Sequence, residues 1–494
     1  MAFPVDPRAL AELPETEIVA VRAAFARAGF DERQMSACEA IAPRQLDAVR
    51  LPAVLHELST RSDDASLLTA AFVYGGAVDG DALARALGTE GFGAMDRVGV
   101  FAPQDGRIRV RLRITPYRGV WIASDDLHEI DPVMGPGRTT DELAHCLDFR
   151  GVSSLLDVGC GAGSLALIAR ASGVAEVVGT DIDPRAIAYA HFNGRLNRLE
   201  CTWLVGDLAA PVQGRRFDAV VSQPAYVAQP MALEGVTFLH GGVRGDELAL
   251  RLLGQLDGLL EPRGKGWVLF DSPEVRVREL TTAVQQSLGT GRLDTCLIVT
   301  PGHSAADQAI GYASLRDRSL GTVYATTYGA YRRHFAGLGV DRVRHALVYV
   351  RGSAGRSVGL ALEPSGLAGF TGKQLDEMLD GVAWAGAPVP ELLAANVRPS
   401  AVARLVHEQS LSAAGDSRLW VRFERGAGVD QELSDTAALL VTCLRDHQPL
   451  EAAVAAYALE MEVAAKDATT QAVTFVRQGL RSGLLVVDPS SPAP

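Results

Sequence analysis

Residues 154–163 read Ser-Leu-Leu-Asp-Val-Gly-Cys-Gly-Ala-Gly, and they decide the fold class of this 494-residue chain. A short apolar run from Leu155 to Val158 leads directly into three alternating glycines, and an apolar helical pattern follows over residues 164–171. A strand, a glycine turn and a helix in succession let the backbone of an α/β protein approach a nucleotide-like ligand closely. The glycine pattern alone is weak evidence, so the residues that follow must identify the ligand.

The composition is that of a globular protein, with 48% apolar and 21% charged residues. No apolar run approaches the roughly 20 residues that a membrane-spanning helix needs, and no basic-then-apolar signal opens the chain, so we expect a cytoplasmic protein without a membrane anchor. The six cysteines form no Cys-x-x-Cys pair, which predicts reduced thiols and no metal site. Abundant Arg, Ala and Gly suggest a bacterial, GC-rich genome.

Three domains are predicted. Residues 1–120 form a helical, winged-helix-like N-terminal domain, residues 121–351 a ligand-binding α/β domain, and residues 352–494 an α+β, winged-helix-like C-terminal domain. Helical patterns alternate with strand patterns in the central domain, so its sheet is expected to be mostly parallel and doubly wound. An insertion at 301–344 is placed to cover the carboxyl edge of that sheet, where ligands bind. The expected strands are 154–158, 176–181, 202–206, 217–222, 266–271, 293–300 and 345–351.

Three acidic residues lie at or near the carboxyl ends of the first three strands. Asp181 ends the second strand about 20 residues after the glycine loop, where a carboxylate accepts both hydroxyls of a ribose. Asp207 ends the third strand and is available to an adenine amino group. Asp157 precedes the glycines, where its charge attracts an ammonium group and repels the pyrophosphate of a dinucleotide. The alternatives are structural: a strand-end cap, a Gly-Asp turn, and an acid bonded to the loop amides.

The run from Leu155 to Tyr226 resembles the class I S-adenosylmethionine-dependent methyltransferases. Within them it is similar to the small-domain group whose fourth strand ends in Asn-Pro-Pro-Tyr, which includes relatives of protein glutamine and ribosomal RNA guanine methylases. The matching stretch is Val-Ser-Gln-Pro-Ala-Tyr at 221–226, and Gly241-Gly242 matches a downstream glycine pair of the family. The resemblance implies a Rossmann-like, seven-stranded, mostly parallel sheet and S-adenosyl-L-methionine as cofactor.

The tetrapeptide departs from that family at two positions. Gln223 stands where Asn is usual, so its amide reaches about one bond further, and Ala225 stands where the second Pro is usual, which relaxes the backbone. In the family, the first amide orients a planar nitrogen and the aromatic residue stacks on it. The departures therefore predict a changed substrate, with loss of activity as the alternative.

Candidate site residues follow from the motifs and the resemblance. In the insertion, the tyrosines at helical spacing form either an aromatic lid over the substrate or a face packed on the core. The expected catalytic residues are Gln223, Pro224 and Tyr226; the expected cofactor-binding residues are Asp157, Gly159, Gly161, Gly163, Asp181, Ile182, Asp207, Leu208, Gln223, Arg138 and Thr139; the candidate substrate-binding residues are Tyr117, Ala225, His240, Tyr324 and Tyr328.

The predicted activity is methyl transfer by a single in-line displacement, which requires positioning of the acceptor and exclusion of water. We expect the acceptor to be a nitrogen, with oxygen as second choice, of a small metabolite or biosynthetic intermediate. The net charge of −12 favours a small-molecule partner over an extended nucleic acid, whose phosphate backbone requires a basic surface. The alternatives are N-methylation of protein glutamine or an RNA base, a non-catalytic binding module, and transfer of the cofactor's aminobutyrate arm. The oligomeric state stays open.

Overall fold

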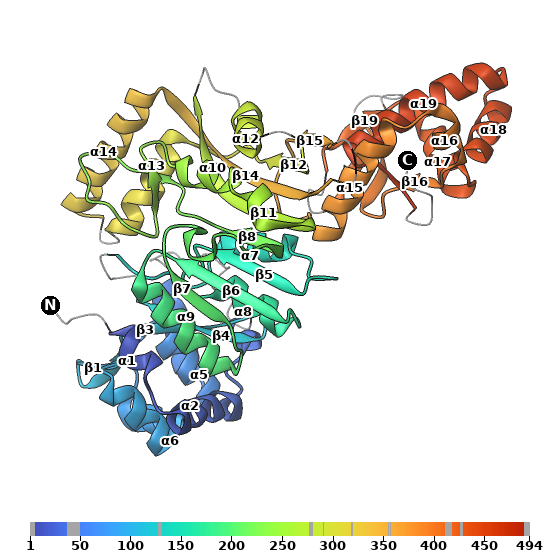
Figure 1. The fold of residues 1–494 in the computed structure, drawn as a ribbon. Helices are drawn as coiled ribbons and strands as arrows, with labels where there is room; N and C mark the ends of the chain where they lie inside the picture. The colour runs from blue at the N-terminus through green and yellow to red at the C-terminus, as the bar shows by residue number, and fades with distance from the viewer. Residues whose placement is uncertain are drawn as a thin grey trace.

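The computed structural model describes a chain built around one large sheet, with a helical region at each end (Figure 1). The N-terminal helices lie beneath the sheet in this view, and the C-terminal helices lie at its upper right. The described residues are 5–36, 50–126, 131–275, 280–289, 291–317, 320–353, 355, 357–410, 417–424 and 428–488, so Cys38 lies outside them.

The large sheet has nine strands in the order β15-β12-β14-β11-β8-β5-β6-β7, with β13 paired to β14. Strand β14 runs antiparallel to both of its neighbours β11 and β12, and the other pairs along this order are parallel. The prediction of a mostly parallel sheet is thus confirmed; all seven expected strands are present, and two more join them. Its strands are β5 (Ser154–Val158), β6 (Glu176–Asp181), β7 (Thr202–Val205), β8 (Phe217–Ser222), β11 (Leu260–Val275), β12 (Leu293–Val299) and β14 (Val340–Gly352), with β13 (His303–Ser304) and β15 (Gly359–Leu362) added.

The strands bury both faces, as expected for near-continuous apolar runs in a parallel sheet. Neighbouring residues of a strand point to opposite faces of the sheet. Leu155 of β5 and Trp267 of β11 belong to one core cluster, whereas the residues after them, Leu156 and Val268, belong to another. Helices α8 (Ser164–Ala171) and α9 (Pro184–Asn197) connect β5, β6 and β7 as predicted. Asp183 caps α9 by accepting from the Arg185 amide, and Pro184 occupies the first turn, where it loses no hydrogen bond. The remaining helices of this region are α7 (Arg138–Cys146), η2 (Ala210–Val212), α10 (Glu247–Leu253), α11 (Leu256–Leu259) and α12 (Leu280–Leu288), beside the short strands β9 (Val227–Ala228) and β10 (His240–Gly242).

The insertion between β12 and β14 is a helical hairpin of α13 (Ala305–Arg316) and α14 (Thr322–Leu338), seen at the upper left of Figure 1. Tyr331 and Phe335 of α14 are buried against Val227 and Ala228. The aromatic stripe of α14 therefore serves packing at these two positions.

The N-terminal region packs against α9. Asn193 of α9 exchanges hydrogen bonds with both backbone groups of Ala123 and also donates to the Ala162 carbonyl 2.9 Å away, so it links this region to the glycine loop. The winged-helix outline stays a prediction. The elements of the N-terminal region are α1 (Pro7–Ala11), α2 (Glu15–Ala28), α3 (Glu32–Ser36), α4 (Leu51–Ser59), α5 (Asp64–Leu68), η1 (Thr69–Val73), α6 (Gly80–Arg97), and the hairpins β1 (Phe101–Gln104) with β2 (Arg107–Val110) and β3 (Leu112–Tyr117) with β4 (Val120–Asp125).

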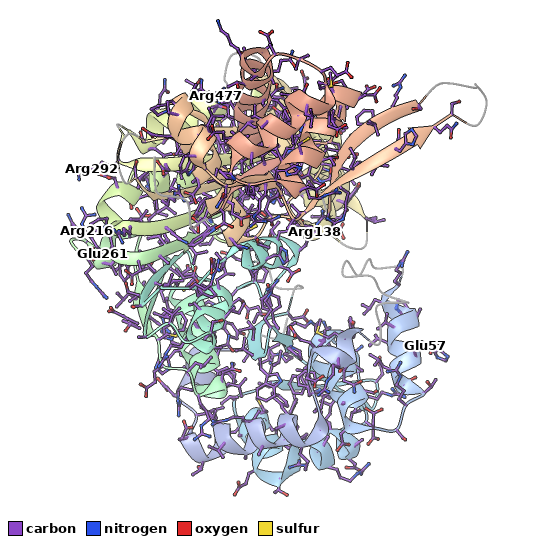
Figure 2. The ribbon with its side chains drawn as sticks, turned by 90° about the vertical axis from the view of Figure 1, so that its right-hand side faces the viewer. Glu57, Arg138, Arg216, Glu261, Arg292 and Arg477 are labelled. Carbon is purple, nitrogen blue, oxygen red and sulfur yellow. The ribbon has the colours of Figure 1, made fainter. Side chains whose placement is uncertain are left out.

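The C-terminal region is fixed to the sheet by charged contacts, including Lys265 to Asp376 and Arg351 to Asp380. The predicted boundary at residue 351 precedes β15, which still belongs to the sheet. Figure 2 shows the β17–β18 hairpin reaching outward from the C-terminal helices. The elements are α15 (Gly372–Ala385), α16 (Val389–Ala394), β16 (Val397–Pro399), β17 (Ala403–Gln409), β18 (Ser417–Phe423), β19 (Gln431–Leu433), α17 (Asp435–Asp446), α18 (Leu450–Glu460), α19 (Ala465–Ser482) and β20 (Leu485–Val487). Among the described helices, none has the length and apolarity to cross a membrane.

Candidate functional site

A cavity of about 780 Å³ opens at the carboxyl edge of the sheet. The residues that line it come from the glycine loop, the ends of β6, β7, β8 and β12, the start of α7, and helix α13. Open α/β sheets bind ligands at this edge because the glycine turns and helix N-termini gather there. Both the cofactor motifs and the altered tetrapeptide of the sequence therefore meet in one cavity.

The glycine loop keeps part of the cavity clear. Gly159 and Gly161 line it with φ angles of +70° and +53°, and a Cβ added at either would meet no protein atom closer than 3.9 Å. A side chain there would project into open space that a ligand needs. Gly163 differs, because it does not line the cavity and its Cβ would lie 2.8 Å from the Trp203 ring. We therefore assign Gly163 to close packing between the loop and β7 and not to its predicted cofactor contact.

Two buried carboxyl groups stand beside the loop. Asp181 accepts from the amides of Gly161, at 2.8 Å, and Asp183, at 2.9 Å, and burial raises its pKa. Asp157 is 1% exposed, and this burial raises the pKa of its carboxyl group. The hydrogen bond from the Ala166 amide, at 3.0 Å, lowers the pKa, whereas the negative charge of Asp181 raises it. The net pKa is about 7. Crowded, desolvated carboxyl groups favour a ligand that brings positive charge and hydroxyl donors.

The end of β7 contributes a more exposed rim. Asp207 lines the cavity, but its side chain is 56% exposed and pairs with Arg251 at 2.5 Å. The Leu208 carbonyl accepts from the Thr180 hydroxyl at 2.8 Å, which fixes this turn against β6. Ile182 also lines the cavity and is 59% exposed. These positions border the mouth of the cavity, and their cofactor contacts stay predictions.

Helix α7 holds the side chain of Gln223. Its Nε2 donates to Thr139 Oγ1 at 2.6 Å, and its Oε1 accepts from Thr140 Oγ1 at 3.2 Å. Thr139 therefore lies beside the tetrapeptide, and its contact with the cofactor stays a prediction. Arg138 also lines the cavity, and its Nε donates to Glu142 at 3.0 Å. Figure 2 labels Arg138 at the start of α7, between the N-terminal helices below and the C-terminal helices above.

Pro224, Ala225 and Tyr226 continue the wall beyond Gln223. Burial raises the pKa of the Tyr226 hydroxyl, and the negative charge of Asp271 raises it further. The phenol is therefore neutral and presents an aromatic surface with a hydrogen-bonding tip. A side chain entering the cavity at this end would meet that ring.

The sequence reasoning missed several residues of the same wall. Asp271 of β11, His345 of β14 and Glu142 of α7 form a charged chain, and Gln308 and Tyr312 of α13 lie beside it. No short motif contains them, because they come from elements as far apart as residues 142 and 345. Residues 365–367, beyond the predicted domain boundary, also line the cavity. From the insertion, Gln308, Tyr312 and Leu315 of α13 line the cavity, and a covering role for the insertion stays a prediction.

Four candidate substrate residues do not line the cavity. Tyr117 lies near Asp141, with 3.5 Å between its hydroxyl and the carboxylate. His240 accepts at Nδ1 from the Val236 amide, and its Nε2 lies 3.0 Å from the Tyr331 hydroxyl. Tyr324 and Tyr328 stack on each other with ring centroids 6.5 Å apart. Structural packing explains these residues better than contact with a substrate does.

The donor set fits an adenosine that bears an amino acid. Open space over Gly159 and Gly161 admits a ligand, and the carboxyl groups of Asp157 and Asp181 match an ammonium and ribose hydroxyls respectively. Among the described residues, no group of three or more His, Cys, Asp or Glu side chains is arranged to hold a metal ion.

Comparisons with known proteins give matches to methyltransferases. Residues 137–239 match the family model of the methyltransferase small domain. The chain is 31% identical over 180 residues to the ribosomal protein L11 methyltransferase of Thiobacillus denitrificans (34% of this chain, 57% of that protein), and 36% identical over 138 residues to that of Dechloromonas aromatica (25% and 45%). It thus spans about half the length of the curated relatives it matches. Among solved structures, the T. thermophilus 16S rRNA N2 G1207 methyltransferase RsmC, in complex with AdoMet and guanosine, is 19% identical, with 42% of this chain and 59% of that chain covered and a TM-score of 0.26.

These relatives correct one expectation. The preference for a small-molecule partner, with no extended nucleic acid, is wrong, because the matched proteins are named for a macromolecular component of the ribosome. The net charge of −12 describes the whole chain and does not report the local surface around the cavity. A whole-chain charge was therefore poor grounds for choosing the substrate.

Proposed function

We propose, from the premise that residues 137–239 form a methyltransferase small domain with S-adenosylmethionine as its cofactor, that the chain methylates a nitrogen of a protein substrate. The observation that carries this proposal is the single cavity in which the glycine loop and the Gln-Pro-Ala-Tyr stretch face each other. The relatives named for ribosomal protein L11 support a ribosomal protein as the substrate class. A ribosomal substrate places the reaction in the cytoplasm.

The residues divide the task between two ends of the cavity. Asp181 binds the ribose, Asp157 binds the amino group, and Gly159 and Gly161 allow the backbone to approach closely. When bound, the cofactor supplies an electrophilic methyl carbon on a positively charged sulfur, so the protein needs no covalent nucleophile. Its remaining work is to orient the acceptor and exclude water.

The other end receives the acceptor side chain. Tyr226 forms a wall on which a planar or aliphatic group packs, and α7 fixes Gln223 through Thr139 and Thr140. Pro224 limits the backbone at this point, because its ring fixes φ. Helix α13 covers the same end from the insertion and reduces access of water to it.

The test is methyl transfer to fractionated ribosomes. The protein is incubated with methyl-labelled S-adenosylmethionine and either dissociated ribosomal proteins or purified ribosomal RNA. We expect label in the protein fraction, removed by protease and resistant to ribonuclease. Label found only in RNA would replace the substrate class, and the absence of label in either macromolecule would contradict the proposal.

A further inference from the structure

A chain of charged side chains that the proposed function leaves unassigned lies in the acceptor end of the cavity. Asp271 of β11 and His345 of β14 are direct cross-strand partners, with Asp271 Oδ1 2.6 Å from His345 Nδ1. The second ring nitrogen, Nε2, lies 3.2 Å from Glu142 Oε2 of α7. All three residues line the cavity. One imidazole therefore lies between two carboxylates from separate elements: its Nδ1 is hydrogen-bonded to Asp271, and its Nε2 is within ion-pair distance of Glu142.

The ring carries a proton at neutral pH. Burial alone lowers the pKa of His345, but the hydrogen bond to Asp271 and the negative charges of Asp271 and Glu142 raise it to about 9. Glu142 is paired in turn with Arg138 at the surface. The imidazolium donates from Nδ1 to Asp271 and so fixes that carboxylate in one orientation, and its positive charge attracts Glu142 beside Nε2.

Asp271 retains capacity for a ligand. Its Oδ1 accepts from His345 and its Oδ2 accepts from Gln308 Nε2 at 3.2 Å, which leaves one lone pair on each oxygen. The side chain is 13% exposed, and its charge reaches the rings of Tyr226 and Tyr312, whose pKa values burial and that charge both raise. The carboxylate therefore faces the aromatic wall of the acceptor end.

Gln223 has less capacity. Its amide nitrogen is bound to Thr139 and its oxygen to Thr140, so the side chain is turned toward α7. A fixed carboxylate is also a stronger acceptor than an amide oxygen, because hydrogen bonds to ionised groups are roughly twice as strong as neutral ones.

We propose that Asp271 is the catalytic residue that accepts a hydrogen bond from the substrate nitrogen and takes up its proton, with His345 and Glu142 as positioning residues. This inference rests on the proposed function. The nitrogen lone pair forms the new N–C bond, the C–S bond breaks with its electron pair left on sulfur, and one N–H proton passes to the Asp271 carboxylate and then to water. The site therefore selects a nitrogen that carries at least one hydrogen.

The test compares three variants for binding and turnover. Asp271→Asn keeps the size and the acceptor for His345 but removes the charge, and we expect turnover to fall about 100-fold or more, the usual contribution of a positioned acid or base. Calorimetry should show wild-type affinity for S-adenosylhomocysteine, which also reports that the variant is folded. His345→Gln should lower turnover, but by less than Asp271→Asn does. Asp294→Asn, which breaks a buried ion pair to Arg351 on the same sheet, is the control: it lowers the melting temperature and leaves turnover unchanged.

A pH profile separates positioning from a general structural role. The charged groups that face His345 are Asp271 and Glu142, so wild-type turnover should decline as pH rises through about 9, when the ring loses the charge that attracts both carboxylates. This decline should be absent in His345→Gln. Wild-type turnover in Asp271→Asn, with an active parent enzyme, would overturn the inference and leave the proposed function intact. A parent that neither binds S-adenosylhomocysteine nor transfers methyl would overturn the proposed function itself.

Discussion

The two ends of the cavity are built in opposite ways. The cofactor end is local: Asp157, Gly159, Gly161 and Asp181 lie within 25 consecutive positions, and backbone amides hold the carboxylates in place. The acceptor end is assembled from α7, β8, β11, α13 and β14, and its side chains hold one another.

Because of this difference, we expect substitutions at the two ends of the cavity to have different effects. At the cofactor end two carboxylates held by backbone amides face a glycine loop that leaves room for the ligand, so a substitution that adds a side chain to the loop fills space that the ligand requires. At the acceptor end recognition depends on side-chain hydrogen bonds, so substitutions there should change turnover and leave cofactor affinity nearly intact. Each prediction below tests one side of this comparison.

The largest effect is expected at Gly161. In Gly161→Val the side chain projects into the cavity from a backbone with φ of +53°, and we expect affinity for S-adenosylhomocysteine to fall more than about 100-fold because strain and obstruction add. Gly173→Val is the matched control, since Gly173 has φ of +98° with open space around it, away from the cavity. It should lose stability while keeping affinity. Equal loss of affinity in both variants would mean that strain alone explains the result.

A smaller effect is expected from pH through Asp157. Its pKa of about 7 means that the carboxyl is largely neutral below pH 7, so affinity for the cofactor's ammonium should rise by up to about 10-fold per pH unit toward pH 7 and then level off. Asp157→Asn should remove this dependence in calorimetric titrations. Because the folded-state pKa is raised from 3.8, the stability that this group contributes is complete below that value and is lost as pH rises through 7. The ligand-free variant should therefore be more stable than the parent above pH 7, and an unchanged pH profile would contradict the role of Asp157.

The smallest effect is expected at Asp207. Its carboxylate is exposed and paired with Arg251, and exposed ion pairs contribute about 0–1 kcal/mol. Asp207→Ala should therefore change S-adenosylhomocysteine affinity by no more than about 5-fold, as measured in the same titrations. A loss of affinity as large as that of Gly161→Val would contradict this expectation and show that Asp207 is essential for cofactor binding.

The same contrast explains how far the sequence could be read. The sheet and the glycine loop were predictable because apolar runs, glycines and strand-end acids occur at short, regular spacings. The chain Glu142–His345–Asp271 was not, because strand register and a helix from before the sheet bring these residues together. The aromatic stripe of α14 was ambiguous for a related reason: Tyr331 and Phe335 pack inward, and only the fold shows that Tyr312 of α13 is the aromatic residue of the insertion that reaches the cavity.

The division between the two ends is tested most directly by calorimetry with S-adenosylhomocysteine on the parent protein, Asp181→Ala and Gln223→Ala. We predict clear binding to the parent, loss of most affinity in Asp181→Ala because the ribose hydroxyls lose a charged acceptor, and affinity within about 3-fold of the parent in Gln223→Ala. The absence of binding to the parent, or equal loss in both variants, would contradict the account.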